Sequence, residues 1–204
     1  MIADVSNNYS VIFQTAESQL PFMGYLLLCV WAFNIINWLF RSPLNLLGIY
    51  PRSAWGLLGI IFSPFLHANF THLFFNSIPF FVLGMFLLTL GKSFFIAVSI
   101  IISISQGILV WLFGRKYIHI GASGVISGYF GFILGLAYLQ PTMISILLAA
   151  VAIYYFGTIL LGILPSAELV SWESHLAGLI SGVVLVYVLW NYPQYELMMV
   201  NLFQ

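Results

Sequence analysis

The hydrophobic residues of this chain fall into long, nearly continuous runs that are separated by short polar or turn-forming breaks. A helix needs about 20 apolar residues to cross a bilayer, and six of the runs approach that length. They predict membrane-spanning helices over residues 20–40, 71–90, 93–113, 123–139, 143–164 and 172–189. The pattern therefore predicts an all-α, polytopic membrane protein built as a bundle of six transmembrane helices.

Glycine, proline and polar residues mark the boundaries of these runs. The breaks lie at residues 91–92, 114–116, 140–141, 164–166 and 191–193. Proline at such breaks stops a helix, and the residue before it avoids the helical region. Pro79 is different because it lies inside the second run, where neighbouring helices can satisfy the freed backbone groups. We expect a kink there and not an end.

Residues 41–70 do not fit a spanning helix. The segment contains two arginines and three prolines, yet it also carries many large apolar residues. That mixture is typical of an amphipathic segment lying in the membrane interface, between the first and second helices. The sequence shows no internal repeat and no second domain, so residues 1–204 are predicted to form a single membrane domain.

Counting the spans places the polar side chains of three helices together. If six helices alternate in direction, the second, fourth and sixth all begin at the same membrane face. His72 and Asn76 lie near the start of the second helix, Ser123 opens the fourth, and His175 lies in the first turn of the sixth. Polar groups inside a membrane usually face the bundle interior and mark function. We therefore expect one polar cluster near one face.

The composition agrees with a lipid environment and excludes several classes of function. The chain is 62% hydrophobic and 5% charged, with five basic and five acidic residues, whereas a soluble domain is about a quarter charged. Its zero net charge gives no electrostatic case for nucleic acid. The single cysteine, Cys29, excludes an internal disulfide. The N-terminus lacks basic residues and carries Asp4 and Glu17, which argues against a signal peptide.

Ser123 and His175 are the residues with the clearest chemical potential. A serine is a weak nucleophile until an adjacent base takes its proton, and histidine suits that role because its ordinary pKa is near neutrality. The two residues are 52 positions apart, so only helix packing can bring them within hydrogen-bond reach, about 2.6–3.2 Å.

A glycine pattern predicts that packing. Small residues four positions apart let two helix backbones approach closely in lipid. The fourth and sixth helices each carry such a pair beside the candidate residue, at Gly124, Gly128, Gly178 and Gly182.

The residues around Ser123 could stabilise an oxyanion. A helix N-terminus offers free backbone N–H groups and a favourable dipole, and His72 and Asn76 share one helix face. His67 lies five residues before His72, which places it in the preceding loop. The only aspartate, Asp4, lies before the first span, and Glu173 points away from His175 on a helix. A Ser–His dyad is therefore the simpler interpretation than a triad.

Three motifs in this order carry a family resemblance. They are His67-x4-His72-x3-Asn76, then Gly121-x-Ser123-Gly124, then His175-x2-Gly178. Together, over residues 63–186, they resemble the rhomboid family of intramembrane serine proteases. The resemblance implies that Ser123 is the nucleophile and His175 the base.

The resemblance also assigns roles to the neighbouring residues. It implies that His72 and Asn76 line the oxyanion site with the backbone of Gly121 and Ala122, and that His67 is structural. It further implies hydrolysis of a peptide bond in or near the transmembrane segment of a protein substrate, with neither a cofactor nor a metal.

Two positions depart from the family pattern. Many members have an aromatic residue four positions after the serine, on which the base histidine stacks, and here that position is Ser127. Either Tyr129 or another ring supplies the stacking, or the stacking is absent. Many members also have a Trp-Arg pair in the first long loop, where this chain has only a separated Arg52 and Trp55.

Three other classes compete with this interpretation. A metal-dependent hydrolase could use His67, His72 and His175, but there is no His-Glu-x-x-His pattern. A catalytically inactive relative could bind or retain membrane proteins, although this chain keeps both Ser123 and His175. A transporter would show inverted repeats and charged midplane sites, and neither is evident. His119 is expected at the membrane interface, outside the catalytic group.

The two indications of orientation disagree. The resemblance implies a cytoplasmic N-terminus and an active site toward the outside. That places four basic residues outside and only Lys92 inside, which is opposite to the positive-inside tendency. A six-span chain without further domains suits the bacterial cytoplasmic (inner) membrane. The sequence carries no indication of oligomeric state.

Overall fold

The computed structural model describes residues 2–164 and 171–192, without the side chains of residues 2–13, 159 and 160. Its secondary structure is helical, which confirms the predicted all-α class. The long helices are α1 (Ile2–Leu39), α3 (Phe70–Thr89), α4 (Lys92–Phe113), α5 (Ser123–Leu139), α6 (Met143–Phe156) and α8 (Trp172–Trp190). The short elements are the 3-10 turns η1 (Pro43–Leu47), η2 (Trp55–Leu57) and η3 (Ser63–Phe65), with α2 (Gly59–Phe62) and α7 (Thr158–Leu161).

Four helices in the described part of the chain are long and apolar enough to cross a membrane. They are the Gln14–Leu39 part of α1, together with α3, α4 and α8. Helices α5 and α6 occupy the two other predicted positions but have only 17 and 14 residues. A 17-residue helix is about 26 Å long, so α5 is shorter than a typical span. The prediction of a polytopic helical membrane protein is confirmed.

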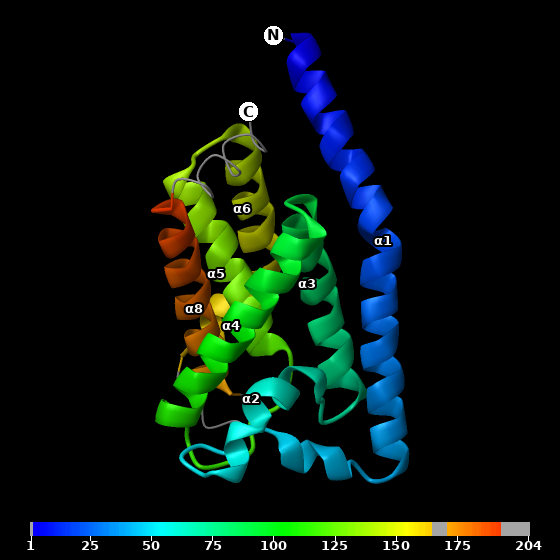
Figure 1. The fold of residues 1–204 in the computed structure, drawn as a ribbon, viewed down its shortest axis with the longest axis vertical. Helices are drawn as coiled ribbons and strands as arrows, with labels where there is room; N and C mark the ends of the chain where they lie inside the picture. The colour runs from blue at the N-terminus through cyan, green and yellow to red at the C-terminus, as the bar shows by residue number, and fades with distance from the viewer. Residues whose placement is uncertain (1, 165–170, 193–204) are drawn as a thin grey trace.

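Helix α1 is longer than the sequence analysis predicted. The expected span began at residue 20, whereas the helix begins at Ile2 and continues through Pro21. At 38 residues it is about 57 Å long, and its N-terminal part extends beyond the other helices (Figure 1). The candidate span within this helix, Gln14–Leu39, covers nearly all of the predicted span. The helix continues beyond it because polar residues end an apolar run without ending a helix.

Helix α6 is shorter than predicted. The expected span covered residues 143–164, but α6 ends at Phe156, and Gly157 separates it from the one-turn α7. Glycine is a poor helix former because it loses the most backbone freedom, and this one interrupts an otherwise apolar run. Part of the break predicted at residues 164–166 lies outside the described residues.

Most of the other predicted boundaries are confirmed. Helix α3 is continuous through Pro79. Gly91 adopts a positive φ of 116° between α3 and α4, a conformation that favours glycine. Thr142 caps α6 through a reciprocal pair of hydrogen bonds with Ser145. At the C-terminal end, α8 stops at Trp190, before the predicted break.

The segment between α1 and α3 forms a series of short helical turns and not one amphipathic helix. Its backbone is fixed to the C-terminal end of α4, because the Arg52 N–H donates to the Trp111 carbonyl at 3.0 Å and the Trp111 indole donates to Ser53 O at 2.8 Å. Ile49 also pairs with His119 in a short antiparallel bridge. The segment nevertheless exposes the apolar face expected at an interface, formed by Leu46, Trp55, Leu57, Leu58, Ile61, Phe62 and Phe65.

Helices α5 and α8 form the most closely packed pair, and they lie side by side in Figure 1. A Cβ atom on Gly178 would overlap the Gly124 carbonyl, and one on Gly182 would overlap the Gly128 carbonyl. The two backbones are therefore in direct contact, as the glycine spacing predicted.

Candidate active site

The loop that enters α5 passes directly against α3. Gly121 has a φ of 120°, which L-residues with a side chain rarely adopt, and its N–H donates to Ser63 O at 2.9 Å. A Cβ atom at Gly121 would lie 2.7 Å from His72 Nε2 and 3.5 Å from Asn76 Nδ2. The glycine thus permits both the turn and the close approach, and Ser123 follows as the first residue of α5.

His72 and Asn76 face this loop from the first turns of α3. Asn69 caps the helix by accepting a hydrogen bond from the His72 N–H at 2.9 Å. The Asn76 Nδ2 atom is buried and has no hydrogen-bond partner among the described residues. A buried amide without a hydrogen bond is costly, so such a donor is usually satisfied by some partner. This donor is therefore available to a ligand bound at the start of α5.

His67 lies in the loop before α3, as predicted. Its N–H donates to Asn34 Oδ1 at 2.8 Å, and its carbonyl accepts from the Trp38 indole at 2.9 Å. Burial, assisted by the neighbouring His72, lowers the pKa of His67 to about 3. The ring is therefore neutral near pH 7, and its Nε2 accepts from the Ala122 N–H at 3.4 Å. The imidazole supports the backbone next to Ser123.

His175 lies in the first turn of α8, also as predicted. Its Nδ1 atom is 3.0 Å from the Gly162 carbonyl oxygen. A carbonyl can only accept, so Nδ1 carries the proton and the Nε2 lone pair remains free in the neutral ring. The ring is also close enough to His72 for the two to interact electrostatically. The structure therefore brings the starts of α3, α5 and α8 to one place.

Ser123 and His175 do not share a hydrogen bond in this structure. The residues that follow them, Gly124 and Gly178, belong to helices whose backbones touch, and the Ser174 carbonyl is 3.1 Å from a Cβ placed on Gly124. Within the described residues, the Ser123 hydroxyl makes no hydrogen bond. Catalytic hydrogen bonds are often long without a substrate and shorten in the complex. The predicted contact between Ser123 and His175 stays a prediction.

Tyr129 does not supply the stacking ring considered for His175. Its side chain is fully buried, its hydroxyl is 2.6 Å from Ser99 Oγ, and its ring packs against Phe80 and Phe95. Tyr129 thus faces α3 and α4, on the side of α5 away from α8. No aromatic ring among the described residues stacks on His175.

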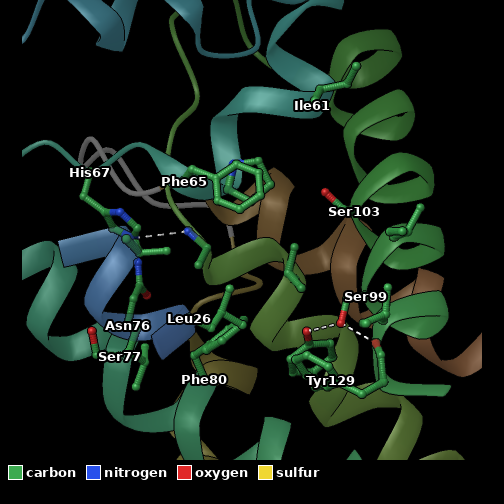
Figure 2. A pocket seen from close by; sticks show the side chains of 18 of the residues that line it. Leu26, Ile61, Phe65, His67, Asn76, Ser77, Phe80, Ser99, Ser103 and Tyr129 are labelled. Atoms are coloured by element: carbon green, nitrogen blue, oxygen red, sulfur yellow. Dashed lines mark hydrogen bonds between the residues drawn. The ribbon is translucent and has the colours of Figure 1, made fainter. Parts of the chain in front are cut away.

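An apolar cavity of about 380 Å³ lies beside the site and is lined by residues of α1, α2, η3, α3, α4 and α5. Figure 2 shows His67 and Asn76 on one side of the cavity and Ser99, Ser103 and Tyr129 on the other. Sequence reasoning missed the cavity because five helices, α1 to α5, contribute its walls and no single pattern marks it.

Two further polar residues, His119 and Glu173, lie near the start of α8. His119 is buried within the protein, with 2% of its surface exposed, and this burial lowers the pKa of its imidazole. Its expected position at the membrane interface stays a prediction. Glu173 points away from His175, as predicted, and forms an ion pair with Arg115. Within the described ranges, no three His, Cys, Asp or Glu residues are arranged to hold a metal ion.

Comparison with known proteins gives the family. A family model described as the Rhomboid domain matches residues 52–192. The chain belongs to the rhomboid family. The matched range contains His67, His72, Asn76, Ser123 and His175, and it encloses the motif region 63–186. Together with the long apolar helices, membership identifies this rhomboid protein as an integral membrane protein.

Similar proteins occur in mycobacteria. An uncharacterized protein of Mycobacterium tuberculosis is 39% identical over 165 residues, which cover 76% of this chain and 69% of that protein. An uncharacterized protein of Mycobacterium leprae is 37% identical over 179 residues, which cover 83% of this chain and 69% of that protein. Neither name states an activity.

Proposed function

We propose that this rhomboid protein is an intramembrane serine endopeptidase, with Ser123 as its nucleophile and His175 as its general base. The observation that carries the proposal is the convergence of three helix starts on Gly121. His72 and Asn76 face this glycine from α3, Ser123 follows it on α5, and α8 touches α5 one residue beyond Ser123.

The hydrogen bond from His175 to Gly162 supports the role of base. In the proposed first step, His175 Nε2 takes the Ser123 hydroxyl proton as Oγ attacks the scissile carbonyl carbon. The resulting imidazolium then protonates the leaving amine, and water hydrolyses the acyl-enzyme. The Gly162 carbonyl keeps the Nδ1 proton in place, which is the tautomer-setting task that an aspartate performs in a triad.

The unpartnered Asn76 amide supports an oxyanion site. The first N–H groups of α5 lack intrahelical acceptors and point toward its N-terminus. Asn76 Nδ2 and the His72 ring approach the same point from α3. In the proposed mechanism the negative oxygen of the tetrahedral intermediate lies among these donors, which contribute most when they are fixed before the reaction.

The position of α6 supports lateral entry of a transmembrane protein substrate from the lipid bilayer. Only three of its 14 residues are buried, namely Ser145, Ala149 and Ala152, so α6 can move at lower cost than α5. The substrate helix must unwind locally, because a helical peptide bond is shielded from attack. The mycobacterial relatives favour a bacterial cytoplasmic (inner) membrane.

A catalytically inactive rhomboid protein that binds membrane proteins is the second candidate. The observation that favours it is the missing hydrogen bond between Ser123 and His175. Both candidates predict a folded membrane protein that contacts transmembrane partners, and only the protease predicts a reactive Ser123. Reactivity therefore separates them.

The test is reconstitution with a model transmembrane substrate and a fluorophosphonate probe. Wild type should cleave the substrate and take up the probe, whereas Ser123→Ala and His175→Ala should do neither while remaining folded. Ser127→Ala is a matched control, because this buried serine lies one turn further along α5 and its hydroxyl has no partner among the described residues. Cleavage by purified Ser123→Ala would refute the assignment, and a wild type without cleavage or labelling would favour the inactive candidate.

A further inference from the structure

A polar cluster joins the loop between α4 and α5 to the first turn of α8. Its centre is the ion pair of Arg115 and Glu173, which are 58 residues apart. Arg115 Nε is 2.5 Å from Glu173 Oε1, Nη2 is 3.1 Å from Oε2, and the Arg115 backbone N–H donates to Oε1 at 3.2 Å. The Glu173 side chain is only 7% exposed and the Arg115 side chain 41%. Such a forked pair fixes direction as well as distance.

A second set of contacts runs parallel to the ion pair. The Tyr117 hydroxyl donates to Glu173 Oε2 at 3.4 Å, and the Tyr117 ring stacks on His119 with centroids 4.0 Å apart. His119 Nε2 donates to the Arg115 carbonyl at 3.0 Å, which leaves Nδ1 to accept from Ser171 Oγ at 2.6 Å. Ser171 is the N-cap of α8. Two connections, Arg115 to Glu173 and His119 to Ser171, therefore link the loop to the start of α8.

The cluster and the glycine contact lie on either side of the candidate dyad along the chain. On α8, Glu173 precedes His175 by two residues, and Gly178 follows it by three. On the other segment, Arg115 and Tyr117 precede Ser123, and Gly124 follows it. Glycine surfaces let helices approach but carry no side chain that resists rotation or sliding. The forked ion pair supplies that resistance.

We propose that Arg115 and Glu173 are positioning residues that set the rotation of the first turn of α8 relative to the start of α5, and thereby the distance from His175 Nε2 to Ser123 Oγ. The inference rests on the proposed function of this dyad. Neither residue touches the reacting atoms, so they act through placement alone. Misplacing a reacting group by about 1 Å can cost roughly 100-fold in rate.

Rate constants per reactive site distinguish positioning from simple stabilisation. Glu173→Gln and Arg115→Lys keep side-chain size but remove the forked pair. We expect each to lower kcat about 10–100-fold with KM changed less than about twofold. Fluorophosphonate labelling should slow by a similar factor and still reach full stoichiometry. The double variant should be no slower than the slower single variant, because both remove one interaction.

Lys116→Gln is the matched control. It removes a positive charge from the exposed residue next to Arg115, and this lysine makes no hydrogen bond or ion pair with the cluster in the described structure. It should label and cleave at the wild-type rate. If Glu173→Gln does not fold, Tyr117→Phe removes only one hydroxyl contact and should slow labelling about 2–5-fold.

Several results would overturn the inference. Labelling of Glu173→Gln and Arg115→Lys at the wild-type rate would overturn it. A smaller fraction of reactive molecules, each labelling at the wild-type rate, would also overturn it. A wild type that never labels would instead count against the proposed function. In that case ¹⁵N chemical shifts of His175 still report its placement, and shifts that are identical in wild type and Glu173→Gln would overturn the positioning role.

Discussion

Helices α5 and α6 are neighbours in the chain but are packed in opposite ways. Eleven of the 17 residues of α5 are buried, and its glycines touch the backbone of α8. Only three of the 14 residues of α6 are buried, and large residues such as Ile146, Leu147 and Ile153 are exposed. Both helices are strongly apolar, so hydrophobicity alone does not distinguish them.

The difference in burial indicates that α5 and α8 form a rigid pair, whereas α6 is held loosely. Protein interiors are close-packed and transmit strain, so the tight contact between α5 and α8 would hold the proposed dyad rigidly. A helix that buries a narrow edge can be displaced without disturbing that pair. The substitutions below test this contrast in order of decreasing effect.

The largest effect is expected at the α5–α8 contact. Gly178→Ala places a methyl group on the Gly124 carbonyl, and because backbone cannot yield as a side chain does, the helices must separate. We expect about 3 kcal/mol of destabilisation and at least about a 100-fold loss of cleavage, measured by thermal unfolding in detergent and by substrate cleavage. Gly24→Ala in α1 is the control, because no atom lies within 4 Å of its added Cβ. Wild-type stability and cleavage in Gly178→Ala would contradict the tight packing of α5 against α8.

The next effect is expected on the α3 side of the site. Asn76→Ala removes the unpartnered amide that faces Gly121. If that amide binds the oxyanion, the rate should fall about 10–1000-fold, with little change in folding because no internal hydrogen bond is lost. Steady-state kinetics with the model substrate measure the change. An unchanged rate would reduce Asn76 to a packing role.

A smaller effect concerns pH and His67. Burial lowers the pKa of His67 from 6.5 to about 3. Between these two pH values, His67 is therefore protonated in the unfolded chain but neutral in the folded chain. The free energy of unfolding is therefore unaffected by the protonation of His67 above about pH 6.5. As the pH falls from 6.5 toward 3, it decreases by about 1.4 kcal/mol per pH unit. His67→Gln should therefore lose about 2 kcal/mol less than wild type between pH 6.5 and 5, as measured by unfolding midpoints. Equal losses would show that His67 does not resist protonation.

The smallest effect is expected on the exposed face of α6. Ile153 is 50% exposed, so Ile153→Ala should change stability by less than about 0.5 kcal/mol. Ala152→Leu, at the fully buried neighbouring position, should cost about 1–3 kcal/mol because it overfills a packed edge. Unfolding midpoints of the two variants, compared with wild type, measure the difference. Similar losses for both would mean that α6 is packed on more than one edge.

The sequence predicted the parts of this protein that depend on pattern. Apolar runs located the long helices, and alternation of their direction placed His72, Ser123 and His175 at one face. Glycine spacing predicted the contact between α5 and α8. Each inference needs only the period of a helix or the length of a span.

What the sequence did not predict depends on contacts without a pattern. The polar residues before Pro21 gave no sign that α1 starts at Ile2, because polarity marks solvent and not helix ends. Arg115 and Glu173 are 58 residues apart, and no spacing rule pairs them. The Gly162 carbonyl could not be singled out, because every residue has one.

That carbonyl belongs to the stretch of chain that follows α6 and α7, whereas the imidazole it orients belongs to α8. A displacement of α6 that carried Gly162 with it would remove the acceptor of the Nδ1 hydrogen bond and leave the ring free to rotate out of its orientation. In the proposed mechanism, movement of α6 for substrate entry would then disable the base. Catalysis would resume only after α6 had returned to its place against the bundle.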